Sequence, residues 1–130
     1  MSATPITHHR QLIVWQRAME LLLATYQLAR RLPREELFGL TSQMRRAAVS
    51  IPSNIAEGHA RFHRGDFVHH LSMSRGSLAE LETLMDACER VDYLEPPELS
   101  EARRLSDEVR RMLGAKIMRL RAKKARGEGE

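Results

Sequence analysis

Residues 64–91 read RGDFVHHLSMSRGSLAELETLMDACERV, and this stretch decides the fold class. Its apolar and small residues recur at alternating steps of four and three, which places them on one face of an α-helix. They are Phe67, Leu71, Ser74, Leu78, Leu81, Met85 and Cys88. Such a seam is typical of a helix packed nearly parallel or antiparallel to its neighbours. We therefore predict one helix over residues 64–91, about 28 residues and roughly 42 Å long.

Two segments before this stretch show the same periodicity. The first extends from about residue 11 to 32 and ends before Pro33, because a residue that precedes proline is disfavoured in the helical region. The second begins near Thr41 and contains Pro52, which removes one backbone hydrogen bond. We predict a helix kinked at Pro52 that ends near residue 57, with Gly58 as its stop.

A fourth helix is expected from Pro97, a favoured first-turn residue, to about residue 124. The connections are short, so successive helices should be antiparallel neighbours. The fold class is therefore all-α, an up-down-up-down four-helix bundle over residues 11–124. Residues 1–10 and 125–130 are expected to be disordered.

The composition agrees with a helical, intracellular protein. Val, Ile and Thr number five each, which argues against a β fold. The single cysteine excludes an internal disulfide and hence a stapled, secreted scaffold. The N-terminus has no apolar signal-peptide core and no apolar run is long enough to span a bilayer, so we expect a cytoplasmic location.

Charge is divided along the chain more sharply than the net value of +4 suggests. Residues 76–101 carry one basic and eight acidic groups, whereas residues 102–130 carry ten basic and four acidic groups. In the predicted bundle the turn after the second helix and the end of the fourth helix lie at the same end. The basic residues expected there are Arg61, Arg64, Arg119, Arg121, Lys123, Lys124 and Arg126.

This basic end suggests contact with the phosphates of RNA or DNA, and the alternative is a solvated helix end with a basic tail. Phe62 is the only aromatic residue among the basic loop residues. On the second helix, Arg45 and Arg46 should face Glu80 or Glu82 of the third helix. We interpret them as structural ion pairs, which specify register more than they add stability.

Catalytic and metal motifs are weak. A di-iron bundle needs Glu-x-x-His pairs, and the sequence contains none. No triad motif accompanies Cys88, which lies on an apolar seam. We therefore expect no enzyme activity, no metal and no cofactor.

Three motifs resemble a known family. They are VWQRAMEL at residues 14–21, LTSQMRRAAVSIPSNIAEG at residues 40–58 and GSLAELET at residues 76–83. The chain resembles the bacterial four-helix-bundle proteins encoded in intervening sequences of large-subunit ribosomal RNA genes. Where that family usually has Tyr-Gly after the Glu-Gly pair, this chain has His59-Ala60.

The resemblance implies a homopentameric ring and a relation to accessory proteins of diversity-generating retroelements, which bind nucleic acid and partner a reverse transcriptase. It carries over no catalytic residue. Our leading hypothesis is a non-enzymatic, ring-forming protein that binds nucleic acid through its basic end. The alternative is a protein–protein adaptor or a structural oligomer with no nucleic-acid role.

Overall fold

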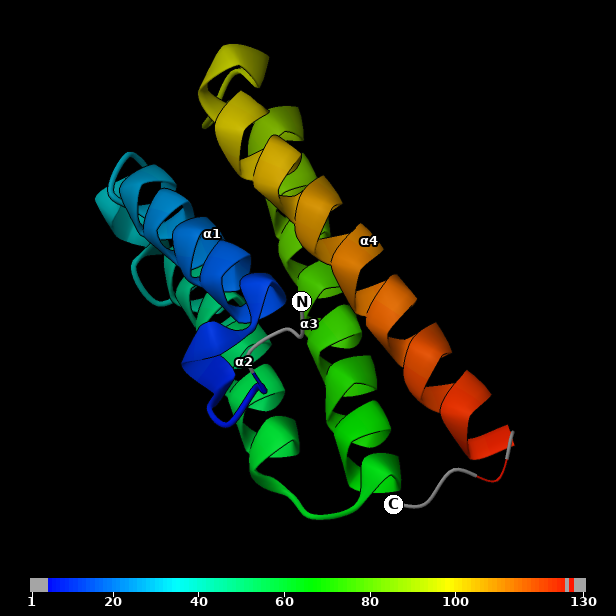
Figure 1. Ribbon diagram of the computed structural model, residues 1–130. Helices are drawn as coiled ribbons and strands as arrows, with labels where there is room; N and C mark the ends of the chain where they lie inside the picture. Colours follow the sequence, from blue (N-terminus) through cyan, green and yellow to red (C-terminus); the bar gives the residue numbers. More distant parts are fainter. Residues whose placement is uncertain (1–4, 126, 128–130) are drawn as a thin grey trace.

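The computed structural model describes residues 5–125 and residue 127. In that part of the chain four long helices form an antiparallel bundle without any β-strand (Figure 1). The helices are α1 (Ile13–Ala29), α2 (Leu40–Ala60), α3 (Arg64–Arg90) and α4 (Pro96–Ala125). A 3-10 turn precedes each of the first two helices: η1 (His9–Gln11) lies before α1, and η2 (Arg34–Glu36) lies before α2. The predicted fold class is confirmed.

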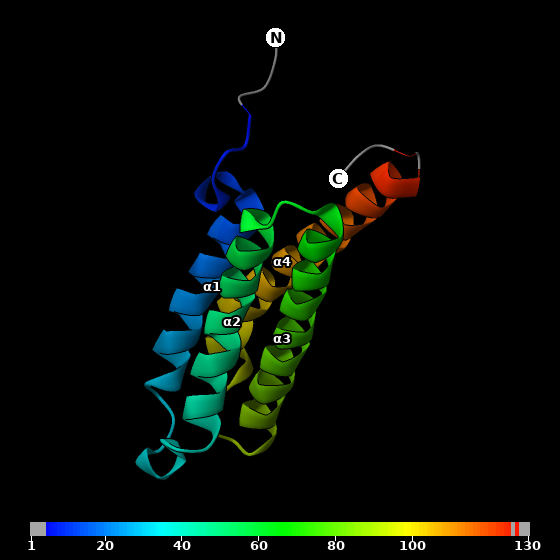
Figure 2. The same ribbon diagram turned by 90° about the horizontal axis from the view of Figure 1, so that it is seen from below.

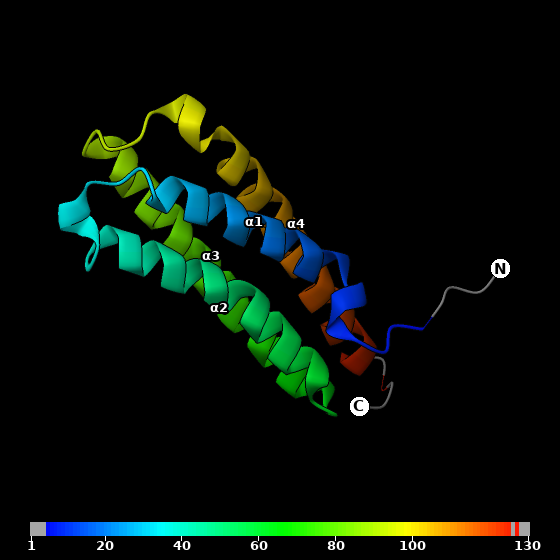
Figure 3. The ribbon, with the colours of Figure 1, turned by 90° about the vertical axis from the view of Figure 1, so that its left-hand side faces the viewer.

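The core lies along the axis of the bundle and uses the seams expected from the sequence. Leu71, Leu78 and Leu81 of α3 are almost completely buried. Each of the other three helices contributes its own buried stripe, for example through Leu21, Ile51 and Leu113. Figure 3 shows the four helices side by side, with short turns joining α2 to α3 and α3 to α4.

The end of α2 corrects the predicted helix stop at Gly58. The helix continues through Pro52 and Gly58 to Ala60. Gly58 is buried against α3, and a Cβ atom at this position would lie 2.6 Å from His70 Cβ and 3.1 Å from Phe67 Cδ1. The absence of a side chain therefore allows a close approach of two helices, rather than a left-handed helix end.

Hydrogen bonds also join α2 to α3 in the middle of the motif that contains Pro52. The Ser74 hydroxyl donates to the Ile51 carbonyl at 2.8 Å, and the Ser50 hydroxyl donates to Ser77 Oγ at 2.6 Å. Asn54 donates to the Ser50 carbonyl of its own helix at 2.8 Å. These small polar residues therefore hold the α2–α3 pair at short range.

The segment before α1 is folded against the bundle over part of its length. His8 caps η1, because its Nδ1 accepts from the Arg10 backbone N–H at 3.2 Å. The Gln11 side chain accepts in return from the His8 backbone N–H at 2.9 Å. Residues 5–10, which were expected to be disordered, thus include a capped turn. Residues 1–4, 126 and 128–130 lie outside the described residues. Within the described chain, no helix is long and apolar enough to cross a membrane.

Candidate nucleic-acid interface

One end of the bundle gathers basic and histidine side chains. Figure 2 shows that η1, the turn between α2 and α3 and the last turns of α4 lie at this end. We define the basic end by the cations that these elements and the start of α3 supply, together with four histidines. The residues are Arg61, Arg64, Lys116, Arg119, Arg121, Lys123, His8, His9, His59 and His63.

The last four turns of α4 contain cations and no acids. Residues 109–125 hold seven basic residues and no carboxylate. Lys116, Arg119 and Lys123 are spaced three and four apart, so they share one face of the helix. We call these three residues the cationic stripe. Partial burial lowers the pKa of Lys116, and the charges of Arg119 and Lys123 lower it further. The stripe is therefore a concentration of like charge.

Histidines lie between the cations of α4 and the neighbouring elements η1 and α2. Burial lowers the pKa of His59, and the charges of Lys116 and His8 add to this shift. The pKa of His9 is also lowered, first by desolvation and then by His8, Arg10 and His59. These mutual effects show that η1, α2 and α4 bring their charges within electrostatic range of one another.

An aromatic residue at the start of α3 links this charge cluster to the bundle. The Lys116 ammonium lies 5.8 Å from the centroid of the Phe67 ring, a cation–π geometry. The His59 ring meets the same Phe67 ring edge-on at 5.7 Å. Phe67 therefore contacts both Lys116 of α4 and His59 of α2.

Six arginines elsewhere in the bundle are neutralised by carboxylates. The ion pairs are Arg17–Glu108, Arg31–Glu98, Arg103–Glu89, Arg104–Glu101, Arg110–Glu82 and Arg111–Asp107. By contrast, Arg119, Arg121 and Lys123 are exposed and have no carboxylate partner among the residues that the structure describes. Glu89, Glu98 and Glu101 at the opposite end each have an arginine partner, so part of the acidic charge there is compensated. The last turns of α4 instead carry several cations in a stretch of sequence without acids.

The other predicted binding residues are only partly brought together. Arg61 pairs with Glu57 of its own helix at 3.1 Å. Arg64 is half-buried in the first turn of α3. Arg121 lies about 200° around α4 from Arg119, so it faces away from the stripe. The side chain of Lys124 and the whole of Arg126 fall outside the described residues.

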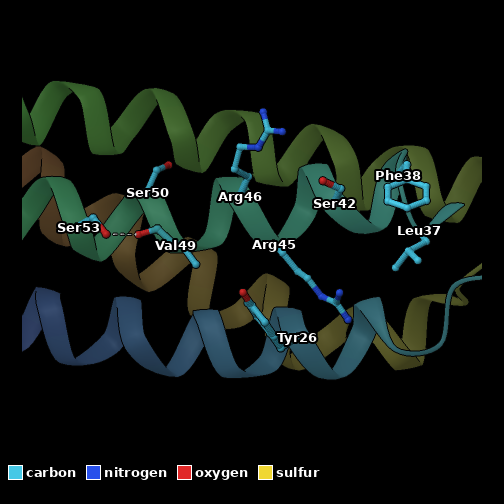
Figure 4. Close-up of a pocket in the computed structure, with 9 residues that line it drawn as sticks. All are labelled: Tyr26, Leu37, Phe38, Ser42, Arg45, Arg46, Val49, Ser50 and Ser53. Atoms are coloured by element: carbon cyan, nitrogen blue, oxygen red, sulfur yellow. Dashed lines mark hydrogen bonds between the residues drawn. The ribbon is translucent and has the colours of Figure 1, made fainter.

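Arg45 and Arg46 do not form the predicted ion pairs with Glu80 and Glu82. Glu82 pairs with Arg110 of α4 instead. Successive residues of a helix point about 100° apart, so Arg45 extends toward α1 and Arg46 toward α3 (Figure 4). The Arg45 guanidinium lies 5.3 Å from the centroid of the Tyr26 ring.

These two arginines flank a shallow hollow of about 670 Å³ on the outer face of α2. Its lining consists of Tyr26, Leu37, Phe38, Ser42, Arg45, Arg46, Val49, Ser50 and Ser53 (Figure 4). We call it the α2 hollow. No acidic residue lines it, and Arg45 Nε is buried without a hydrogen-bond partner in the described chain.

Sequence reasoning missed two features of the basic end. Lys116 is absent from the basic residues predicted for this end, although it lies in the acid-free run at 109–125. His8 and His9 were placed in a disordered segment, and no local pattern indicated that η1 would bring them to His59.

Other chemistry finds little support in the described chain. No three His, Cys, Asp or Glu side chains group there in a way that could hold a metal ion. Burial raises the pKa of the Cys88 thiol, which contacts the Met44 sulfur at 3.7 Å inside the core. The Cys88 thiol is thus neither exposed nor activated.

Together these features define an all-α bundle in which an acid-free run of cations lies at one end. The chain matches the 23S rRNA-intervening sequence protein family over residues 10–115, and it belongs to that family. A solved structure from Bacteroides thetaiotaomicron VPI-5482, described as a protein with unknown function from the S23 ribosomal protein family, has the same fold. Its TM-score is 0.74 at 24% identity, over 80% of this chain and 97% of that chain. Among curated proteins, none matches this sequence.

Proposed function

We propose that this chain is a non-enzymatic protein that binds nucleic acid, RNA or DNA, through its basic end. The observation that carries the proposal is the cationic stripe. Partial burial lowers the pKa of Lys116 and the charges of Arg119 and Lys123 lower it further, and no carboxylate of the described chain compensates these three residues. A polyanion would relieve the repulsion among them.

The arrangement suits phosphate contact better than recognition of base sequence. Lys and Arg side chains that neutralise phosphates release counterions, which is the main source of affinity in sequence-independent binding. Three cations on one helical face present a row of charge, and η1 adds His8 and His9 beside it. A row of charge without a groove-reading helix or strand favours binding that tolerates many sequences.

The test is a titration of labelled RNA and of duplex DNA at two salt concentrations. We expect binding at low salt that weakens strongly as salt rises. Replacing Arg119, Arg121, Lys123, Lys124 and Arg126 together should weaken the salt dependence. An absence of binding at low salt, or binding that ignores salt, would overturn the proposal.

We further propose that copies of the chain assemble into a ring, a pentamer as the resemblance to the family implies. Support comes from the α1–α2 face, where the α2 hollow continues into a second hollow of about 300 Å³. The two hollows share Val49 and Ser53. Among the apolar side chains of these linings, Phe38 is 93% exposed and Val49 is 39% exposed. Aromatic and arginine side chains are the types enriched at protein interfaces.

Light scattering tests the ring. Five chains of 14.9 kDa give about 75 kDa, and a mass near 15 kDa would contradict the assembly. Val49→Glu should reduce the mass by placing a charge where the two hollows meet. Val91→Glu is a matched control, because Val91 is 53% exposed in the turn that follows α3.

A protein–protein adaptor is the second candidate, and the α2 hollow favours it. In that case a second protein, rather than another copy, occupies the hollow. A pull-down that survives nuclease treatment and recovers one stoichiometric partner would support the adaptor over the nucleic-acid protein.

A further inference from the structure

An exposed phenylalanine stands at the basic end. Phe62 occupies the short turn between α2 and α3 and is 96% exposed, so its ring contributes almost nothing to the core. Leaving a full aromatic ring in water forgoes the stabilisation that burial would give it. A fully exposed ring at a turn therefore calls for a contact outside the folded chain.

Arginines flank Phe62 in the sequence. Arg61, which pairs with Glu57, precedes it, and Arg64 follows two residues after it. The turn leads into α3, whose Phe67 meets the Lys116 ammonium of the cationic stripe. Figure 2 shows the turn and the last turns of α4 at the same end. A ligand that covers Phe62 is thus within the positive field of the stripe.

A ligand for this site needs a flat apolar face close to negative charge. An unpaired nucleotide has both, because its base can stack on an aromatic ring while its phosphates contact cations. A duplex offers its phosphates but keeps its bases stacked and paired inside, so it leaves Phe62 without a partner.

We propose that the basic end selects unpaired, single-stranded nucleic acid and that Phe62 stacks on one of its bases. This inference rests on the proposed function and names the form of nucleic acid that the same site takes. Phe62 supplies an uncharged contact, and the cationic stripe supplies charge. The two contributions are separable, because only the second depends on salt.

The chain offers a matched control for this role. Val91 is also exposed, to 53%, and it lies in the turn after α3 at the opposite end of the bundle. Val91→Ala removes exposed apolar surface from a site away from the stripe. Phe62→Trp keeps an aromatic surface at the proposed stacking site.

The experiment measures the affinity of the full chain for labelled oligo-uridylate and for a duplex of equal length, each at several salt concentrations. Phe62→Ala should weaken binding of the single strand about 5- to 100-fold, the range seen when one stacking residue is removed. Its salt slope and its affinity for the duplex should stay unchanged. Phe62→Trp and Val91→Ala should bind the single strand as the unmodified chain does.

Three results would overturn the inference alone while the proposed function stands. Phe62→Ala could bind the single strand normally, or lose affinity for single strand and duplex equally. It could also lower the mass in light scattering, which would place Phe62 in a contact between copies. If the unmodified chain binds neither probe at low salt, the proposed function itself fails and the inference with it.

Discussion

A single methyl group added at Gly58 tests whether this glycine sets the distance between α2 and α3. In Gly58→Ala, the new Cβ would lie 2.6 Å from His70 Cβ, 3.1 Å from Phe67 Cδ1 and 3.3 Å from the Phe67 carbonyl oxygen. His70 Cβ is fixed to the α3 backbone and the carbonyl belongs to it, so neither can turn away. The α2 and α3 helices must therefore separate locally.

The size of the effect follows from two opposing contributions. Alanine is favoured over glycine inside a helix by roughly 0.5–1 kcal/mol. Overpacking a close contact costs about 1–3 kcal/mol. Because the shortest contact is to a backbone-attached carbon, we expect packing to win, with a net loss of about 1–2 kcal/mol in the free energy of unfolding. For a chain of this length, the melting temperature should fall by roughly 4–8 °C.

Two other glycines provide the matched comparison. Gly76 in α3 and Gly114 in α4 lie inside helices, and an added Cβ would meet no atom within 4 Å at either position. Alanine should therefore raise the free energy of unfolding by roughly 0.5–1 kcal/mol at each site, through helix preference alone.

Urea unfolding followed by circular dichroism, at one protein concentration for all variants, measures the three differences. The change in the free energy of unfolding should have opposite signs for Gly58→Ala and for the two controls. If Gly58→Ala stabilises the chain as much as the controls do, Gly58 does not set the distance between α2 and α3.

The remaining predictions concern pH and buried hydroxyls. Folding lowers the pKa of His9 and His59, so the unfolded chain binds protons more readily than the folded chain as the pH falls below their ordinary pKa of 6.5. The free energy of unfolding should therefore decrease over this range. Urea titrations of His9→Gln and His59→Gln should show a smaller decrease. Over the same range nucleic-acid affinity should rise, which binding titrations at several pH values can check. Ser74→Ala removes the hydrogen bond to Ile51 and should cost about 1 kcal/mol in chemical unfolding. Ser106→Ala should be neutral or stabilising in the same assay, since that buried hydroxyl has no partner in the described chain; a loss equal to that of Ser74→Ala would contradict this.

The bundle could be predicted from sequence because its signals are local and repeated. The seam of residues 67–88 recurs every three or four residues, and every such position that was singled out except Phe67 is buried. Gly58 was misassigned because a glycine near a helix end has the same local appearance whether it stops the helix or allows a close contact. Only the neighbouring helix, through His70, distinguishes the two cases.

The site was predictable as a charge distribution but not as a set of contacts. The acid-free end of the fourth helix is visible in the sequence, and α4 carries it to the basic end. The predicted ion pairs of Arg45 and Arg46 require a particular rotation of α2 about its own axis. An error of one residue in the register turns a side chain by about 100° around that axis. Sequence spacing does not fix that rotation closely enough to choose between Tyr26 and Glu82 as the partner of Arg45.

The most direct test of the account compares how salt weakens nucleic-acid binding in two triple variants of α4. Lys116→Gln, Arg119→Gln and Lys123→Gln together remove the cationic stripe. Arg104→Gln, Arg110→Gln and Arg111→Gln remove three arginines of the same helix that are paired with carboxylates. For a single-stranded probe, loss of the stripe should reduce the slope of the logarithm of the binding constant against the logarithm of the salt concentration by about 2. The second variant should keep the unmodified slope. Equal slopes in the two variants would contradict the claim that the basic end binds nucleic acid.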